Sequence, residues 1–347
     1  MVTRVRLVNF KNHADTTIEL GRMTALLGPN GVGKTSVLQG VHHVTSRPEH
    51  GVNNYDYSIL RIGAPHCKVT LHVSQSDLAQ PAFLEHFLEN SQDGWDSDNR
   101  TGWGEDSAAP TPLWHLYDRY KSTLLRLTPQ ALKRPSYVEL IPPRLEPDGT
   151  GLASVIQFIV GDRLDDFITL QSVLKSVVSV IEGVRVKPYR MPDIGHREAR
   201  PRIGQKLFFD TKSGAGVPAE AISDGSIVTL GILAAIFSHE EPDLLLIDDV
   251  EQGLHPEAQR ELIQQLRKLL DVFPELQIVM TTHSPYVADE LEPEEIYLIK
   301  ADTDGIAQAK RLSEHPDAHE ALKLLTTGEF WSAVGEDWVL EAANASA

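Results

Sequence analysis

Eight consecutive residues near the N-terminus have the types and spacing needed to hold a chain of phosphates. The segment Gly28-Pro29-Asn30-Gly31-Val32-Gly33-Lys34-Thr35 matches the phosphate-loop pattern G-x-x-x-x-G-K-T. In such a loop backbone N–H groups turn toward phosphate oxygens, Lys34 reaches the β- and γ-phosphates, and the Thr35 hydroxyl ligates Mg²⁺. An apolar run at 24–27 and apolar periodicity over 35–44 predict a strand before the loop and a helix after it. The sequence therefore predicts a site for ATP and Mg²⁺.

A pair of acids follows a second apolar run. Asp248 and Asp249 come directly after Leu244-Leu245-Leu246-Ile247. Carboxylates at the C-terminal end of a buried strand lie where a phosphate-loop enzyme needs them. Alone, the pair could be a helix cap or surface acids. Beside the phosphate loop, we expect Asp248 to hold Mg²⁺ and Asp249 to orient the attacking water.

Two weaker motifs occur in the same half of the chain. Ser223-Asp224-Gly225 precedes a helix predicted over 226–238, and its N–H groups could bind an anion, although Ser-Asp-Gly is also a common cap and turn. His283 follows a strand predicted over 278–281 and could hydrogen-bond a γ-phosphate or the attacking water. A lone histidine is more often a structural residue.

The elements that must position these residues alternate between strand and helix after residue 205. Strands at 207–209, 244–247, 278–281 and 296–299, with a helix beginning at Pro256, indicate an α/β fold with a mostly parallel sheet. Strands at 3–9, 16–20 and 68–73 predict an N-terminal antiparallel β part. The acidic stretch Glu89–Pro112 is interpreted as a surface loop or partly ordered insert. Apolar periodicity at Leu113–Leu132 and Leu152–Ile181 predicts a mainly helical insertion.

Bulk composition limits the class of protein. The chain has 347 residues with a formal charge of -17, so general charge attraction would not bind it to nucleic acid. No apolar run is long enough to span a membrane, and no signal peptide is evident, so a soluble cytoplasmic protein is expected. The single cysteine, Cys67, excludes an internal disulfide.

The four motifs occur in the order and setting of the ABC-type ATPases, and the chain most resembles the SMC/RecF-like branch. The opening Leu7-Val8-Asn9-Phe10-Lys11-Asn12-His13-Ala14-Asp15 resembles the first strand and turn of the repair ATPases of that branch. Asp248 to Pro256 resembles the Walker B and D-loop segment. Ser223 to Ser226 resembles the Ser-Asp-Gly signature of predicted ATPases in prokaryotic anti-phage defence loci and of the overcoming-lysogenization-defect (OLD) family. The resemblance covers about 1–45 and 205–300.

The resemblance implies roles for individual residues. Lys11 and Asn12 would lie by the nucleotide, and His283 would be the switch histidine. Ser223 would contact the γ-phosphate of ATP held by a second subunit, which implies a head-to-tail homodimer or higher oligomer around ATP. The other residues assigned to nucleotide or metal are Asn30, Gly31, Val32, Gly33, Lys34, Thr35, Ser36, Gly225 and Asp248. The glutamine of the usual Q-loop is not placed.

On this basis the chain divides into four predicted segments. These are a Walker A lobe at 1–75, a lid-like helical insertion at 76–204, a lobe at 205–312 with signature, Walker B and switch histidine, and a helical tail at 313–347. The family usually has Glu where this chain has Asp249, and the shorter acid predicts slow hydrolysis. Glu251 is a possible substitute but more plainly belongs to the D-loop. Asp302-Thr303-Asp304-Gly305 imitates a nuclease acidic pair, yet reads more simply as a hairpin turn.

Three functions stay open. The first is an ATPase that acts in a nucleic-acid-linked process, such as anti-phage defence, with a separately encoded effector. The second is a non-catalytic ATP-dependent assembly switch, and the third is a RecF-like DNA repair ATPase. A locally basic stretch, Arg185 to Lys206, is the best candidate for a nucleic-acid contact, with a solvated basic loop as the alternative. Phe330, Trp331 and Trp338 either dock a partner or seal the edge of the core.

Overall fold

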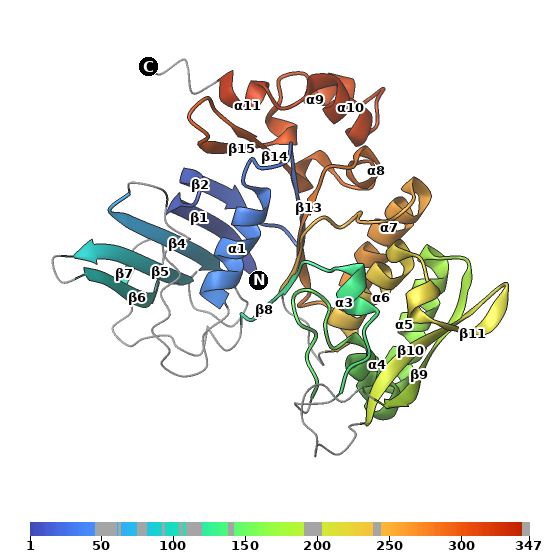
Figure 1. The fold of residues 1–347 in the computed structure, drawn as a ribbon. Helices are drawn as coiled ribbons and strands as arrows, with labels where there is room; N and C mark the ends of the chain where they lie inside the picture. Colours follow the sequence, from blue (N-terminus) through green and yellow to red (C-terminus); the bar gives the residue numbers. More distant parts are fainter. Residues whose placement is uncertain are drawn as a thin grey trace. The chain divides into compact units, whose positions relative to one another are not determined.

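The structure of the protein is a computed structural model. The chain forms two compact units. The described residues are 1–45, 61, 64–74, 82–91, 94–103, 107–108, 120–137, 142–190, 203–238 and 244–341. Unit 1 comprises Met1–Leu124, Leu246–Val250 and Glu275–Ala347, and unit 2 comprises Leu125–Leu245 and Glu251–Pro274 (Figure 1). These units divide the chain at other places than the four predicted segments, whose functional division stays a prediction. Among the described residues, no helix has both the length and the apolar character needed to cross a membrane.

A mixed sheet of six strands runs through the centre of unit 1. Its order is β15-β14-β3-β13-β12-β8. The strands are β3 (Met23–Leu27), β8 (Ser122–Leu125), β12 (Leu244–Ile247), β13 (Gln277–Thr282), β14 (Ile296–Ala301) and β15 (Ala307–Arg311). Strand β3 pairs in parallel with β13 and β14, and β15 is antiparallel to β14. Strands β3, β12 and β13 are buried along their whole length, which explains the apolar runs 25–27, 244–247 and 278–280 within them. The predicted α/β fold with a mostly parallel sheet is confirmed.

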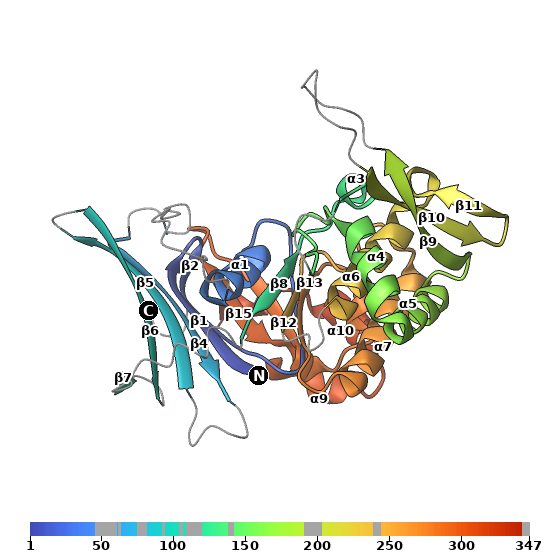
Figure 2. The same ribbon diagram turned by 90° about the horizontal axis from the view of Figure 1, so that it is seen from below.

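An antiparallel sheet of order β2-β1-β4-β5-β6-β7 forms the N-terminal layer. It contains β1 (Val2–Phe10), β2 (His13–Glu19), β4 (His66–Val73), β5 (Ala82–Ser91), β6 (Gly94–Trp103) and β7 (Ser107–Ala108). Helix α1 (Lys34–Thr45) contacts β1, β4 and β5 on one side and β13 on the other, so it lies between the two sheets (Figure 2). Its predicted inner face, Val37, Leu38 and Val41, is fully buried.

The interpretation of Glu89–Pro112 as a loop is wrong for its described part. Strand β5 pairs with β4 from Ala82 to Glu89, and β6 pairs with β5 from Gly94 to Trp103. Strand β6 is rich in Gly, Asp, Asn and Ser, residues that strands usually avoid. Its hydrogen-bonded pairing with β5 is a tertiary effect that this composition does not reveal.

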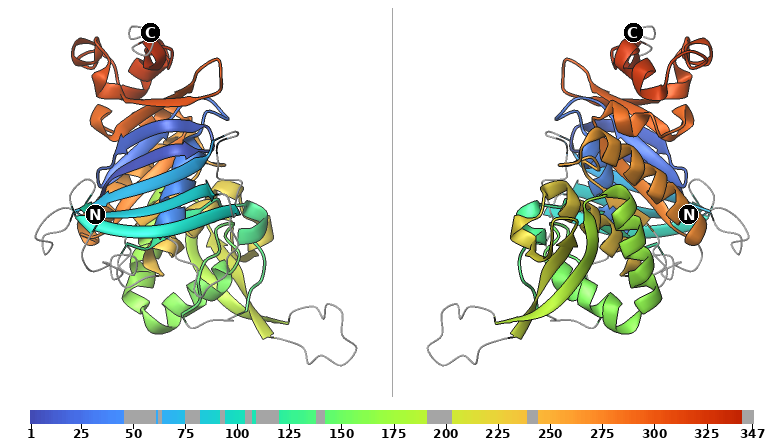
Figure 3. Two further views of the ribbon diagram at one scale, coloured as in Figure 1. Left: turned by 90° about the vertical axis from the view of Figure 1, so that its left-hand side faces the viewer. Right: turned by 90° about the vertical axis from the view of Figure 1, so that its right-hand side faces the viewer.

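The described part of unit 2 contains one buried α-helix, four other α-helices and a small sheet. The helices are α3 (Pro129–Leu132), α4 (Leu152–Asp162), α5 (Leu164–Val177), α6 (Asp224–Phe237) and α7 (Pro256–Val272), and the sheet order is β11-β10-β9. Its strands are β9 (Ile181–Arg190), β10 (Ile203–Thr211) and β11 (Gly214–Pro218), beside the short helix η2 (Ala219–Ala221). Helix α6 contacts α3, α4 and α5, and α5 and α4 also cover β9 and β10 (Figure 3). Because α6 is apolar on every side, it forms the core of this unit.

The predicted helical insertion is therefore only partly correct. Helices α4 and α5 confirm the helical prediction for Leu152–Ile181. The described part of Leu113–Leu132 instead forms strand β8 and only a single helical turn, α3. A strand of four residues with only two apolar ones, such as β8, cannot be distinguished by periodicity from part of a helix. With β5, β6, β8 and β9 also present, the described part of 76–204 is mixed rather than mainly helical.

The C-terminal segments complete unit 1. They are α8 (Pro285–Ala288), η3 (Pro293–Glu295), η4 (Leu312–Glu314), α9 (Ala318–Ala321), α10 (Thr327–Val334) and α11 (Trp338–Glu341). Phe330, Trp331 and Trp338 are each at most 9% exposed, so they seal the core edge and are not available for docking. The turn between β14 and β15 contains Gly305 at φ +76°, which confirms the hairpin predicted there.

Candidate nucleotide-binding site

The predicted phosphate loop lies between β3 and α1, as its flanking pattern indicates. Three of its residues, Gly28, Gly31 and Gly33, have positive φ angles of 143°, 79° and 110°. Such angles favour glycine, because a Cβ atom there clashes with the backbone. A Cβ on Gly28 would also lie 2.2 Å from the carbonyl oxygen of Ile299. The glycines are thus required by the path of the backbone.

Lys34 folds back over this loop. Its Nζ donates hydrogen bonds to the carbonyl oxygens of Gly28 at 2.6 Å and Pro29 at 2.8 Å, and the residue is only 6% exposed. The structure thereby places a buried ammonium group on the loop whose N–H groups are predicted to bind phosphate. Of the other predicted contacts, Asn30 and Gly31 are exposed, Val32 is buried, and Ser36 is half-buried.

The two predicted magnesium ligands meet at the start of α1. The Thr35 Oγ1 atom lies 2.8 Å and 3.1 Å from the carboxylate oxygens of Asp248. A third residue, Thr281 on β13, donates from its own hydroxyl to Asp248 Oδ1 at 2.8 Å. A hydroxyl and a carboxylate at this spacing form the kind of oxygen donor set that Mg²⁺ uses when phosphates and water supply the remaining ligands. The donors present therefore fit the predicted ion.

Asp249 has an unusual backbone that explains why this position holds a short acid. Its φ is +53°, and its N–H donates to Thr281 Oγ1 at 2.8 Å. Asp and Asn tolerate this left-handed region far better than longer acids such as Glu. Thr281 therefore fixes both acids, accepting from the N–H of Asp249 while donating to the side chain of Asp248.

The structure brings Asp249 and the predicted switch histidine together. His283 Nδ1 lies 3.9 Å from Asp249 Oδ1, and both side chains are more than half exposed. This arrangement leaves both groups accessible at the end of the sheet that carries Asp248. In contrast to these two exposed side chains, Glu251, the possible substitute for Asp249, is only 6% exposed, and it belongs to unit 2.

The turn between β1 and β2, with the first residue of β2, contacts the backbone of the phosphate loop. Asn12 Nδ2 donates to the carbonyl oxygen of Val32 at 2.9 Å, and Lys11 Nζ donates to Gln39 Oε1 on α1. His13, which the sequence motifs did not single out, lies with Nε2 3.1 Å from the carbonyl oxygen of Gly33. Only its place next to Asn12, within the segment Leu7 to Asp15 that resembles the repair ATPases, could have indicated this contact.

The predicted signature residues lie in unit 2, at the start of α6. Ser223 is exposed and caps the helix, accepting a hydrogen bond from the N–H of Ser226 at 3.4 Å. Gly225 is needed for packing, because a Cβ there would lie 2.4 Å from the carbonyl oxygen of Gly253 in the turn after β12. The predicted roles of Ser223 and Gly225 toward nucleotide stay predictions.

The described ends of the basic stretch Arg185 to Lys206 form strands rather than a solvated loop. Lys187 and Lys206 stand directly opposite each other on β9 and β10. Lys187 Nζ lies 4.7 Å from the ring centroid of Phe208, and Lys206 Nζ lies 5.2 Å from that of Tyr189. Lys206 also pairs with Glu220 at 2.8 Å. Arg197, Arg200 and Arg202 lie outside the described residues.

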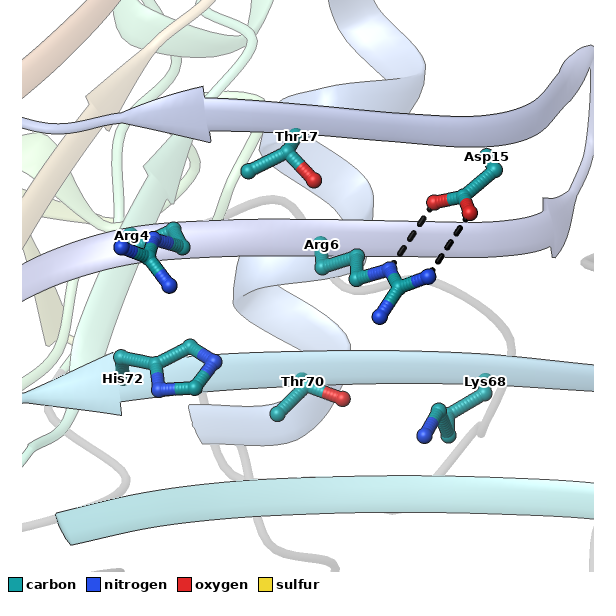
Figure 4. Close-up of a pocket in the computed structure, with 7 residues that line it drawn as sticks. All are labelled: Arg4, Arg6, Asp15, Thr17, Lys68, Thr70 and His72. Carbon is teal, nitrogen blue, oxygen red and sulfur yellow. Dashed lines mark hydrogen bonds and ion pairs between the residues drawn. The ribbon is translucent and has the colours of Figure 1, made fainter. Parts of the chain in front are cut away.

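A shallow depression on the outer face of the antiparallel sheet also carries basic side chains (Figure 4). Arg6 pairs with Asp15 through two hydrogen bonds of 2.8 and 2.9 Å, which lower the pKa of Asp15. Arg4 pairs with Glu19 at 2.7 Å, and Lys68 pairs with Glu85 at 3.2 Å. Each of these cations thus has a carboxylate partner, which makes the depression a salt-bridged sheet face of little net charge.

Comparison with known proteins places this architecture in a family. Residues 133–289 match the family described as "AAA domain, putative AbiEii toxin, Type IV TA system". The chain is 32% identical over 175 residues to the retron Vc95 probable ATPase of Vibrio cholerae serotype O1 biovar El Tor, a match covering 46% of this chain and 30% of that protein. It is 22% identical over 338 residues to the OLD nuclease of Thermus scotoductus, covering 88% of this chain and 63% of the nuclease. The chain thus spans less than two thirds of either relative.

A solved structure shows the same fold. The SMC head bound to the C-winged helix domain of ScpA superimposes with a TM-score of 0.63 at 12% identity, covering 93% of this chain and 99% of that one. This likeness covers both the mixed sheet and the N-terminal antiparallel sheet. The chain therefore has the fold of the SMC heads and is related to the retron and OLD proteins.

Proposed function

We propose that this protein is an ABC-type ATPase that binds ATP with Mg²⁺ on the loop Gly28 to Thr35 and hydrolyses it slowly. The supporting observation is the meeting of Thr35 Oγ1 with Asp248 at 2.8 Å, which joins residues 213 positions apart at the end of a phosphate loop. In the proposed site, backbone N–H groups and Lys34 hold the phosphates, while Thr35 and Asp248 hold Mg²⁺. The ion, when bound, neutralises charge on the β- and γ-phosphates.

The reaction itself is assigned to Asp249 and His283. Asp249 would accept a hydrogen bond from the water that attacks the γ-phosphorus, and His283 would hydrogen-bond the same water or the γ-phosphate. The bond between the γ-phosphorus and the β–γ bridging oxygen breaks, and ADP leaves. The short side chain and left-handed backbone of Asp249 limit how its carboxylate reaches the water, and this supports slow turnover.

Assembly is proposed to depend on ATP. Ser223 is exposed at the N-terminus of α6, so it can contact the γ-phosphate held by a second copy of the chain. Each copy would then complete the other's site, giving a head-to-tail dimer or a higher oligomer. The relationship to retron and OLD proteins supports a role in anti-phage defence, with a separately encoded effector that responds to the dimer.

A nucleic-acid contact is proposed for the ribbon formed by β9 and β10. Like charges directly opposite each other destabilise an antiparallel pair, yet Lys187 and Lys206 occupy such positions. The rings of Tyr189 and Phe208 lie beside these lysines. Tyr189 is within the basic stretch, and the pairing of β9 with β10 brings Phe208 to it as a second aromatic residue. Two lysines and two rings on one ribbon suit phosphates and unstacked bases.

Two alternatives lead to different measurements. A non-catalytic switch, in which ATP drives assembly and hydrolysis is incidental, is favoured by the short acid at Asp249. A RecF-like DNA repair ATPase is the other alternative. A DNA-stimulated turnover favours a nucleic-acid-linked ATPase, whereas tight ATP binding with negligible turnover favours the switch.

The test combines size and turnover on one protein preparation. Light scattering after gel filtration should show a dimer with ATP and Mg²⁺ and a monomer with ADP, and Asp249→Asn should make the ATP dimer persist. Phosphate release is measured in parallel with and without single-stranded DNA, duplex DNA or RNA. A monomer in every nucleotide state would contradict the proposed assembly, and absent phosphate release would leave the switch as the function.

A further inference from the structure

The turn between β1 and β2 holds two consecutive carbonyl groups of the phosphate loop. Asn12 Nδ2 donates to the carbonyl oxygen of Val32 at 2.9 Å. His13 Nε2 lies 3.1 Å from the carbonyl oxygen of Gly33, which also accepts the N–H of Val37 at 3.2 Å in the first turn of α1. Adjacent residues of one turn thus contact adjacent peptide groups of the loop.

The geometry of the peptide bond gives these contacts a consequence. In a planar trans peptide the C=O and the following N–H point in opposite directions. Fixing the carbonyl of Val32 therefore fixes the direction of the Gly33 N–H. Fixing the carbonyl of Gly33 fixes the direction of the Lys34 N–H in the same way. Both carbonyls point toward the turn, so both N–H groups point away from it.

His13 is built to donate at this position. It is fully buried on β2, and this burial lowers its pKa from 6.5 to about 4. A carbonyl oxygen can only accept, so the neutral ring must carry its proton on Nε2 to bond Gly33. Its unprotonated Nδ1 lies 3.0 Å from the Thr16 hydroxyl, which also lies 3.2 Å from the carbonyl oxygen of Ala307 and shares its one hydrogen between these two acceptors. This second contact holds the ring in the orientation that Gly33 requires.

The contact leaves no room for a side chain at Gly33 while Asn12 and His13 keep their positions. A Cβ on Gly33 would lie 2.7 and 2.8 Å from the amide atoms of Asn12 and 2.9 Å from His13 Nε2. General core packing would be served by apolar side chains, whereas this turn places two polar donors against two carbonyls. The polar atoms of the turn are therefore matched to the backbone of the loop.

We infer that Asn12 and His13 are positioning residues that orient the Gly33 and Lys34 N–H groups toward the β-phosphate before a nucleotide arrives. The inference rests on the proposed nucleotide site. It assigns Asn12 an action through the loop backbone in place of direct contact with the nucleotide. Because the β-phosphate is common to ADP and ATP, loss of either residue lowers the affinity for both nucleotides by the same factor. Loss of a residue that touches the γ-phosphate would lower the affinity for ATP alone.

The test uses pairs of variants that differ in one donor. His13→Gln keeps a donor near the place of Nε2, whereas His13→Asn keeps a polar group near Nδ1 and cannot reach Gly33. Asn12→Asp keeps the shape of Asn12 and removes its N–H donors. Ile18→Ala, in the buried core of β2, is the control for general destabilisation of the sheet. Affinities for Mg-ATP and Mg-ADP are measured by calorimetry, and folding of each variant by thermal unfolding.

We expect His13→Asn and Asn12→Asp to lower the affinities for ADP and ATP equally. Each variant should lose about five- to tenfold, as for loss of one hydrogen bond. His13→Gln should bind within about twofold of the wild type, and Ile18→Ala should bind normally at temperatures where it is folded. Equal affinity of His13→Asn and His13→Gln, or a loss confined to ATP, would overturn the inference. If the wild-type chain itself binds neither nucleotide, the proposed function fails instead.

Discussion

The hydroxyl of Thr35 donates a hydrogen bond to the carboxylate of Asp248 at 2.8 Å, although Thr35 lies in the first turn of α1 and Asp248 directly follows β12, 213 positions later. Thr281 adds a second hydroxyl to the same carboxylate at 2.8 Å. Asp248 is thus held by two neighbouring elements, α1 and β13. This geometry makes the proposed metal-binding pair, Thr35 and Asp248, part of the fold and lets its two members be tested separately.

Replacing Thr35 tests whether its hydroxyl serves the ion. Thr35→Val keeps the shape of the side chain but removes the ligand, so half-maximal ATP binding should require at least about tenfold more Mg²⁺. Thr35→Ser keeps the hydroxyl and is the matched control, with a Mg²⁺ requirement close to that of the wild type. The measurement is a magnesium titration at fixed ATP, followed by a fluorescent nucleotide analogue. Equal requirements for the Val and Ser variants would remove Thr35 from the metal site.

Replacing Asp249 with Asn separates chemistry from folding. Asn tolerates a φ of +53° as well as Asp does, and the side chain is exposed, so the free energy of unfolding should change by less than about 0.5 kcal/mol. Phosphate release should fall by about 10²-fold, because the carboxylate that orients the water is lost, while ATP affinity is retained. Release at the wild-type rate would show that another group carries this role.

The nucleotide half of the site could be predicted from sequence because its residues are close together or follow clear apolar runs. The loop Gly28 to Thr35, the strand before Asp248 and the helix at Pro256 all occur where predicted. The role of His13 toward Gly33 could not be predicted, since it depends on which turn packs beneath the loop. Strand β6 was missed because its polar composition does not indicate a strand, and the pairing that stabilises it is with β5.

The same limit applies to Gly225. The sequence suggested an anion-binding turn, whereas the structure also shows a close backbone approach to Gly253. Such contacts between distant glycines leave no periodic pattern. They appear only once the turn after β12 is placed against the start of α6.

Gly225 provides a stability test with a matched control. Gly225→Ala places a Cβ 2.4 Å from the carbonyl oxygen of Gly253, so backbone must move and stability should fall by about 2 kcal/mol. Gly161→Ala, in helix α4, meets no atom within 4 Å and should raise stability by about 0.5 kcal/mol. Urea unfolding measures both. If the two substitutions have the same effect, the contact of Gly225 with Gly253 does not constrain the fold.

The buried His13 predicts a dependence of stability on pH. Its pKa is about 4 in the folded protein and near 6.5 when unfolded, so only the unfolded chain takes up this proton as the pH falls from 6.5 toward 4. Stability is therefore full above pH 6.5 and decreases below it, by about 1.4 kcal/mol from this residue at pH 5.5. Urea unfolding of the wild type and His13→Gln at pH 8 and 5.5 should show a smaller decrease for Gln. Identical decreases would mean that His13 is not buried in its neutral form.

The binding of Mg-ATP to the wild-type chain and to Lys34→Ala tests the central claim most directly. Lys34 is the ammonium group that lies on the loop. The control for loss of one positive charge is Lys323→Ala, because Lys323 forms an exposed ion pair with Glu320 of α9. Calorimetry should show one site per chain for the wild type and Lys323→Ala, with affinity at least about 10²-fold weaker in Lys34→Ala. No measurable heat of binding in the wild type, or an unchanged affinity in Lys34→Ala, would contradict the assignment of this loop as the nucleotide site.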